Sequence, residues 1–107
     1  MHMLIITFQL KGISEADYLA QCKEKAPMLA AFPGLHSKVW LADSATNTYG
    51  GVYLWKDRQA MEAFTHSDIV KAVAARPYLT NFTLKDYAIA EDLSRVTRGI
   101  ITQNAQA

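Results

Sequence analysis

The chain has 107 residues and a formal net charge of +1, and half of its residues are hydrophobic. This length and composition predict a single domain, residues 1–107, of ordinary globular type. The basic residues are scattered, which argues against nucleic-acid binding, and no apolar run approaches the roughly 18 residues of a membrane span. Cys22 is the sole cysteine, so we expect no disulfide framework and a reducing, cytoplasmic location.

The first half of the chain predicts a strand followed by a helix. Met3 to Leu10 alternates, with Leu4, Ile6, Phe8 and Leu10 on one side and Ile5, Thr7 and Gln9 on the other. Ser14 is a good helix N-cap, and apolar residues then recur at helical spacing: Tyr18, Leu19, Cys22, Ala26 and Leu29. Pro27 falls inside this pattern and predicts a kink or a separate last turn.

Residues 33–55 predict a long hairpin whose two sides differ. A polar turn over residues 43–48 joins the strands, and Gly50-Gly51 predicts a bulge or a close approach by another strand or a ligand. One side is aliphatic: Leu35, Val39, Leu41, Val52 and Leu54. The other side carries aromatic rings and polar tips: His36, Lys38, Trp40, Tyr53 and Trp55.

The second half predicts two short helical segments and a last strand. Asp57 can cap a helix that extends through Phe64, and Ser67 can cap a segment that ends near Ala75. Residues 81–89 alternate as a strand, and residues 91–107 form a C-terminal arm that frays from Gln103. The arm has few apolar anchors: Leu93, Val96, Ile100 and Ile101. The order β-α-β-β-α-β predicts a ferredoxin-like α+β fold with an antiparallel sheet and helices on one face.

The two faces of this sheet should differ in what covers them. We expect the aliphatic sides of the strands to face the helices, and the opposite face then collects the hairpin aromatics by alternation. With Tyr87 of the last strand there are four aromatic side chains on this face, which present about 600–1,000 Å², more than a monomer usually exposes in one patch. We therefore expect a second copy to cover this face, giving a homodimer with a cavity at the sheet.

Three motifs carry a resemblance to a known family. They are P-G-L-H-S-K-V-W-L at 33–41, Y-G-G-V-Y-L-W at 49–55 and Leu93-Ser94 in the tail. The chain resembles the YdhR-like monooxygenases of the dimeric α/β-barrel superfamily, which includes the antibiotic-biosynthesis monooxygenases. The resemblance implies a homodimer with a pocket under each sheet and no bound metal or flavin. The chain departs from the family where Ala90-Glu91-Asp92 replaces a frequent Asn-Glu-Pro stretch.

The candidate catalytic residues are Lys38, Tyr53, His36 and Tyr87. Lys38 or His36 could act as a general base or as a cation that stabilises an oxyanion, and both could instead point to solvent at the rim of a barrel. Tyr53 or Tyr87 could donate a proton to a carbonyl oxygen, or could be a buried hydroxyl with a backbone partner.

The candidate substrate-binding residues are Trp40, Trp55, Ile5, Thr7, Gln9 and Ile89. The tryptophans could form a slot for a flat apolar ligand, or could pack the interior of a dimer. We expect no metal site, because no ligand set occurs at metal-binding spacing, and no cofactor, because dinucleotide and phosphate-loop motifs are missing.

These residues favour a cofactor-independent monooxygenase that oxidises a small aromatic or quinol-like compound. Two alternatives remain open: a non-enzymatic dimer that binds a small apolar molecule, and an isomerase of a small lactone. Haem degradation also occurs in this superfamily and would require a ligating histidine, for which His66 is the nearby candidate.

Overall fold

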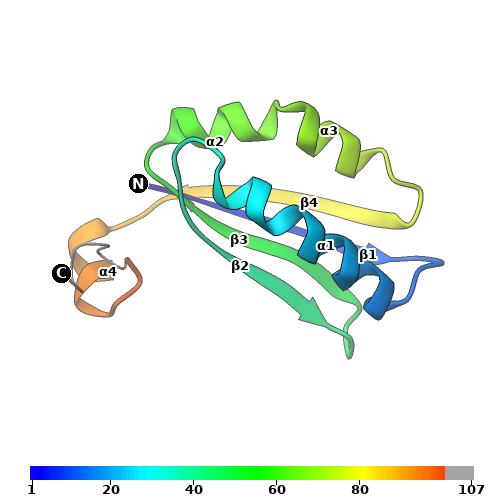
Figure 1. Cartoon of the computed structure of the whole chain (residues 1–107). Coiled ribbons are helices and arrows are strands. Elements are labelled where there is room, and N and C mark those ends of the chain that lie inside the picture. The colour runs from blue at the N-terminus through cyan, green and yellow to red at the C-terminus, as the bar shows by residue number, and fades with distance from the viewer. Residues whose placement is uncertain (101–107) are drawn as a thin grey trace.

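The computed structural model describes residues 1–100 and confirms the predicted order of elements. The strands form one antiparallel sheet in the order β2-β3-β1-β4, and helices α1, α2 and α3 lie over one of its faces (Figure 1). This is the ferredoxin-like arrangement. The bounds are β1 His2–Leu10, α1 Glu15–Ala30, β2 Leu35–Asp43, β3 Thr48–Trp55, α2 Arg58–Thr65, α3 Asp68–Ala74, β4 Leu79–Ala88 and α4 Glu91–Val96.

The predicted N-caps are present at the three helices that cover the sheet. Ser14 accepts a hydrogen bond from the Asp17 N–H at 3.1 Å, and Asp57 accepts one from the Ala60 N–H at 2.8 Å. Ser67 caps α3 in the same way. Such caps satisfy backbone donors that have no partner within the helix. Within the described residues, no helix is long and apolar enough to cross a membrane.

The prediction that Pro27 splits off the last turn of the first helix was wrong. Helix α1 continues through Pro27 to Ala30, and the Ala31 N–H donates to the Pro27 carbonyl at 3.2 Å. Pro27 is exposed and lies only one turn from the helix end. A proline at this position removes a single backbone hydrogen bond and leaves the rest of the helix intact.

The assignment of the hairpin faces was also wrong. In the antiparallel pairing of β1 with β3, Leu4 lies opposite Tyr53 and Phe8 lies opposite Tyr49. Directly opposed residues project to the same face of a sheet. Tyr53, Trp55 and Trp40 therefore join Leu4 on the face that the helices cover, and they belong to the hydrophobic core or pack against it.

The physical reason is that both sides of the hairpin are apolar. Alternation shows which residues share a side, but it does not show which side a helix will cover. The aromatic side chains bury more area than the aliphatic ones, so covering them gives the larger hydrophobic gain. Trp55 is accordingly 0 % exposed, whereas Val39 on the aliphatic side is 62 % exposed.

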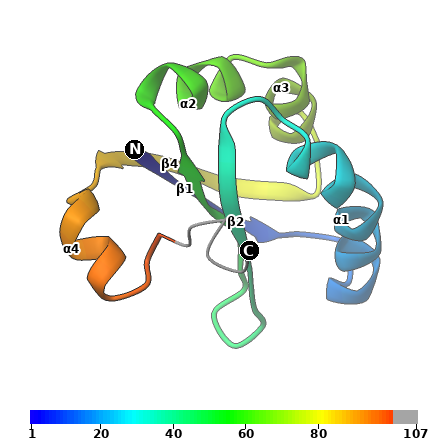
Figure 2. The same ribbon diagram turned by 60° about the vertical axis from the view of Figure 1, so that its left-hand side comes forward.

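The face turned away from the helices is only partly covered. Val39 and Tyr87 are exposed there, while Leu54 is buried. Helix α4 stands apart from the other helices, beside one end of the sheet (Figures 1 and 2). Of the expected apolar anchors of the arm, Ile100 is buried, but Leu93 and Val96 are 72 % and 76 % exposed. Ile101 and the predicted fraying from Gln103 lie outside the described residues.

The Gly50-Gly51 pair confirms the predicted close approach. Gly50 has φ +133°, and a Cβ atom at this position would lie 1.9 Å from the carbonyl oxygen of Ile6 on β1. A side chain would therefore meet both an unfavourable backbone conformation and a backbone clash. Glycine at this position is required for β1 to pair with β3.

We predict that Gly50→Ala lowers the free energy of unfolding by about 2–5 kcal/mol, because strain and overpacking add. Gly12→Ala is the matched control: Gly12 also has a positive φ, of 78°, but no atom lies within 4 Å of the added carbon. The control should lose only about 1–2 kcal/mol. Urea unfolding of both variants measures the difference, and equal losses would contradict the proposed clash.

Candidate active site

A cavity of about 100 Å³ lies between the helices and the covered face of the sheet. Apolar side chains from β1, α1, α3 and β4 form most of its lining, including Ile6, Phe8, Leu29, Val70, Val73, Leu79 and Phe82. A few polar or titratable side chains interrupt this lining: Tyr18, Gln21, Cys22, Lys25, Lys38, Tyr53 and Arg76. A mostly apolar hollow with a few polar groups is typical of a small-molecule site.

Lys38 extends from β2 into this cavity and lies against two aromatic rings. Its Nζ is 3.3 Å from the centroid of the Trp40 ring and 4.5 Å from that of the Tyr53 ring. Within residues 1–100 no carboxylate pairs with it. Burial lowers the pKa of Lys38 to about 8, and charge on the nearby Cys22 acts in the opposite direction. An amine with such a pKa can exchange protons near neutral pH.

Gly51 provides the space that Lys38 occupies. A Cβ atom on Gly51 would lie 2.5 Å from Cε of Lys38 and 3.2 Å from Cε1 of Tyr53. Trp40 lies directly opposite Gly51 in the β2–β3 pairing. The two glycines thus have different tasks: Gly50 lets two strands approach, and Gly51 lets a lysine side chain lie across the sheet.

Tyr53 is held in place by aromatic neighbours. Its ring stacks on Trp55 with centroids 6.0 Å apart and an interplanar angle of 9°, and it also contacts Phe64 at 5.1 Å. Burial raises the pKa of Tyr53, and Cys22 contributes in the same direction. The phenol therefore stays protonated and can act as a hydrogen-bond donor. Trp55 stacks on the Tyr53 ring but does not itself line the cavity.

Tyr18 and Cys22 form part of the α1 wall. Burial raises the pKa of Tyr18, the adjacent Cys22 adds to the rise, and Arg76 opposes it. Cys22, which the sequence pattern placed in the core, is half-buried in the cavity wall.

Sequence reasoning did not select Tyr18, Gln21, Lys25 or Arg76. One signal was available for two of them: Gln21 and Lys25 recur at helical spacing within the otherwise apolar stripe of α1.

His36 lies outside the main cavity. It lines a second hollow of about 250 Å³ between α1 and β2, together with Ser37. Leu29, Lys38 and Trp40 line both hollows and so form the partition between them. The structure therefore brings Lys38 and Tyr53 together in one cavity and places His36 on the other side of that partition.

Several predicted site residues lie on the opposite face of the sheet, away from the cavity. Thr7 pairs by its hydroxyl with Thr83, and Gln9 accepts a hydrogen bond from Asn81. Ile5 and Tyr87 share this face, because their registers place them opposite Val52 and Met3. Ile89 follows the last strand, and none of Ile5, Thr7, Gln9, Tyr87 and Ile89 lines the cavity.

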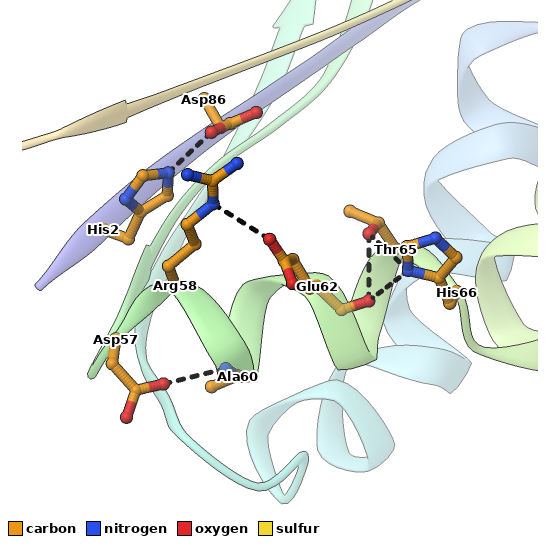
Figure 3. A network of polar contacts seen from close by, with 8 residues as sticks. All are labelled: His2, Asp57, Arg58, Ala60, Glu62, Thr65, His66 and Asp86. Atoms are coloured by element: carbon orange, nitrogen blue, oxygen red, sulfur yellow. Dashed lines mark hydrogen bonds and ion pairs between the residues drawn. The ribbon is translucent and has the colours of Figure 1, made fainter.

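His66 also lies away from the cavity, at the end of α2. Its ring Nδ1–H donates to the carbonyl oxygen of Glu62 at 2.8 Å, and the side chain is exposed (Figure 3). The same view shows a buried histidine, His2, whose Nε2 lies 2.6 Å from Oδ1 of Asp86. Across the described part of the chain, no three His, Cys, Asp or Glu side chains gather where they could hold a metal ion.

Comparison with protein families gives a match over almost all of the described residues. The family described as "Putative mono-oxygenase ydhR" matches residues 3–100. The chain belongs to the YdhR family. Among curated proteins no match was found.

Solved structures share the fold of this YdhR-family chain at low sequence identity. SnoaB, a cofactor-independent oxygenase from Streptomyces nogalater, is 17% identical over 82% of this chain and 91% of its own, with a TM-score of 0.66. A Deinococcus radiodurans protein described as a "putative antibiotic biosynthesis monooxygenase" is 16% identical over 84% and 93%, with a TM-score of 0.69. The haem degrader MhuD from Mycobacterium tuberculosis, with two haems bound in its active site, is 16% identical over 84% and 96%, with a TM-score of 0.66.

We predict that Lys38 titrates with a pKa near 8, below the 10.5 of an ordinary lysine. ¹³C NMR of labelled lysine side chains measures this value, and the signal that disappears in Lys38→Met assigns it. Gly51→Ala should push the lysine out of its site and return its pKa toward the ordinary value, because the closest contact of the added methyl is with the flexible end of the lysine side chain. An unchanged pKa in Gly51→Ala would contradict this account.

The same shift predicts how stability depends on pH. The folded-state pKa of Lys38 lies below its unfolded value, so the unfolded chain binds more protons between about pH 8 and pH 10.5. The contribution of Lys38 to the free energy of unfolding should therefore rise with pH across this window and be lost as the pH falls through it. Unfolding titrations of the wild type and of Lys38→Met, compared at several pH values, isolate this contribution.

Proposed function

We propose that this YdhR-family protein is a cofactor-independent monooxygenase that oxidises a small aromatic or quinol-like compound in the cavity between sheet and helices. The observation that carries the proposal is Lys38, a partly buried amine without a carboxylate partner in the described chain, which lies against Trp40 and Tyr53 and has its pKa lowered to about 8. Such a group can serve as the general base that this chemistry requires.

In the proposed reaction the substrate supplies all the electrons. Neutral Lys38 removes a proton from a phenol or from a methylene group between aromatic rings, and the resulting carbanion or phenolate adds to O₂ to form a peroxide. Loss of the second C–H proton then breaks the O–O bond, one oxygen stays as a carbonyl and the other leaves as water. A methylene and O₂ thus give a carbonyl and water, and no external reductant is consumed.

The other cavity residues have roles that follow from their positions. Trp40 offers a flat wall on which an aromatic substrate can stack, and Tyr53 can donate a hydrogen bond to the oxygen that becomes negative. The apolar lining keeps water away from the carbanion and strengthens both interactions.

Two other functions use the same cavity. A dimeric binding protein would need the aromatic wall but no base, and an isomerase of a small lactone would need Lys38 and Tyr53 but no O₂. Haem degradation, the activity of MhuD, has less support, because none of the described residues that line the main cavity is a histidine.

We also propose that the protein acts as a homodimer, with a second copy seated on the sheet face opposite the helices. This face exposes Val39 and Tyr87, and the nearby arm exposes Leu93 and Val96. Exposed apolar side chains that gather on one face can mark a protein–protein contact. The cavity then lies on the helix side of the sheet in each protomer, away from the partner.

We predict oxygen uptake by the wild type with anthrone- or naphthol-type substrates, measured with an oxygen electrode. Lys38→Met should lower kcat by about 10²–10⁴-fold, and Tyr53→Phe by about 10²-fold. The control is Lys85→Met, on the opposite sheet face, which should keep full activity. The log of kcat/KM should rise with pH and level off above about 8, where Lys38 is neutral.

The outcomes separate the three functions. Tight binding without oxygen uptake for every compound tried would favour the binding protein, and turnover of a lactone under nitrogen would favour the isomerase. Oxygen uptake that persists in Lys38→Met would contradict the role of the lysine.

We predict that Val39→Asp converts the dimer to monomers, because it buries a charge in the proposed contact. Light scattering after size exclusion measures the mass. Leu19→Asp is the control, since Leu19 is also an exposed apolar residue but lies on α1. A monomeric wild type, or equal effects of the two substitutions, would count against the dimer.

A further inference from the structure

The charged residues around the cavity are all of one sign. Lys25, Lys38 and Arg76 line it, and among residues 1–100 no aspartate or glutamate does. The whole chain is nearly balanced, with 11 basic and 10 acidic residues. A cavity with cations alone therefore has a local excess of positive charge, which favours an anionic ligand.

Arg76 lies in the connection between α3 and β4, where the side-chain amide of Gln21 holds its guanidinium. Its Nη1 donates to Oε1 of Gln21 on α1 at 3.1 Å, and the Tyr78 hydroxyl donates to the same oxygen at 2.6 Å. The amide oxygen thus bridges two donors and holds the guanidinium at the cavity. This bond uses one N–H of the guanidinium, and the remaining donors have the planar arrangement that suits a carboxylate.

Two of the three other arginines in the described chain show a different pattern, and the third, Arg98, is exposed to solvent. Arg58 pairs with Glu62, and Arg95 pairs with Glu91 and Asp92, all on their own helices. Arg76 has only a neutral amide as its acceptor in the described structure, although it is partly buried. A partly buried guanidinium without a counter-ion can take its counter-ion from a ligand.

Arg76 and Lys38 line different parts of the cavity. Cε of Lys38 lies beside Gly51, which pairs with Ile6 on β1, while Arg76 shortly precedes Leu79, which pairs with Leu10. Ile6 and Leu10 are about 13 Å apart along β1, at roughly 3.3 Å per residue. The two long side chains can therefore contact different parts of one small ligand: Lys38 its reacting ring and Arg76 a group at its other end.

We propose that the ligand is an aromatic carboxylate, with its ring between Trp40 and the apolar walls and its carboxylate on the guanidinium of Arg76. Lys25, one turn along α1 from Gln21, adds positive charge to the cavity wall. The inference rests on the proposed function, because it names the substrate class of the same cavity. A phosphate would favour several converging donors, whereas the cations here are spread around the cavity, so a single carboxylate fits better.

The test measures binding without turnover. Isothermal titration calorimetry at pH 7 under nitrogen compares 2-naphthoate, its neutral amide and 2-naphthyl phosphate as probes of equal ring size. We expect naphthoate to bind at least tenfold tighter than the amide. Its affinity should fall with added salt, and that of the amide should not.

Substitutions then identify the anchor. Arg76→Gln should weaken naphthoate about tenfold and leave the amide within twofold, and Arg76→Lys should recover only part of the loss. Lys25→Gln, at another cation of the cavity lining, gives a second and milder test that does not depend on the Gln21 contact. Lys23→Gln is the control, an exposed cation of the same helix outside the cavity. Circular dichroism of each variant confirms that it is folded.

Each other outcome overturns the inference. Equal affinity for naphthoate and its amide would show that the cavity does not prefer an anion. Tightest binding of 2-naphthyl phosphate would indicate that the ligand carries a phosphate and not a carboxylate. A full loss of the naphthoate preference in Lys23→Gln, or none in Arg76→Gln, would remove Arg76 as the anchor. Any of these results could occur together with oxygen uptake on a neutral quinol. In that case the proposed reaction would hold and only the aromatic carboxylate would be excluded as the substrate class.

Discussion

In the pairing of β1 with β3, Leu4 lies opposite Tyr53 and Ile6 lies opposite Gly51. This register depends on Gly50, because any side chain there would collide with the Ile6 carbonyl. The pairing brings the aromatic side of the hairpin onto the same face as the aliphatic side of β1, so the helices cover both. A shift by one residue would exchange the two faces and expose the cavity residues to solvent.

The partial burial of the Lys38 amine costs free energy. Removing an ammonium group from water disfavours the charged form, and within residues 1–100 no carboxylate compensates for it. The faces of Trp40 and Tyr53 offset part of this cost through cation–π attraction, and Gly51 leaves room for the side chain. A more stable cavity would hold an apolar residue at this position, so the lysine fits a chemical role better than a structural one.

The two faces of the sheet differ in what they carry: one holds the cavity, and the other exposes apolar side chains. The helix face is covered by the chain itself and holds a cavity that both Lys38 and Arg76 line. The opposite face keeps Val39 and Tyr87 exposed, and the arm adds Leu93 and Val96. Association through that face would stabilise the sheet from behind without entering the cavity, so assembly and chemistry can be altered separately.

The order of elements and the caps at Ser14, Asp57 and Ser67 were readable in the sequence, because each depends on neighbouring residues. The glycine pair indicated a close approach, but the strand that approaches it, β1, is far away in the chain. Lys38, Trp40 and Tyr53 were also selected as one group, since alternation places them on one side of the hairpin. Which side the helices cover was decided only by the tertiary structure, because both sides are apolar and the register with β1 joins residues far apart in the chain. The position of Arg76 at the cavity was also decided by the tertiary structure, because its partner Gln21 lies on α1, far away in the chain.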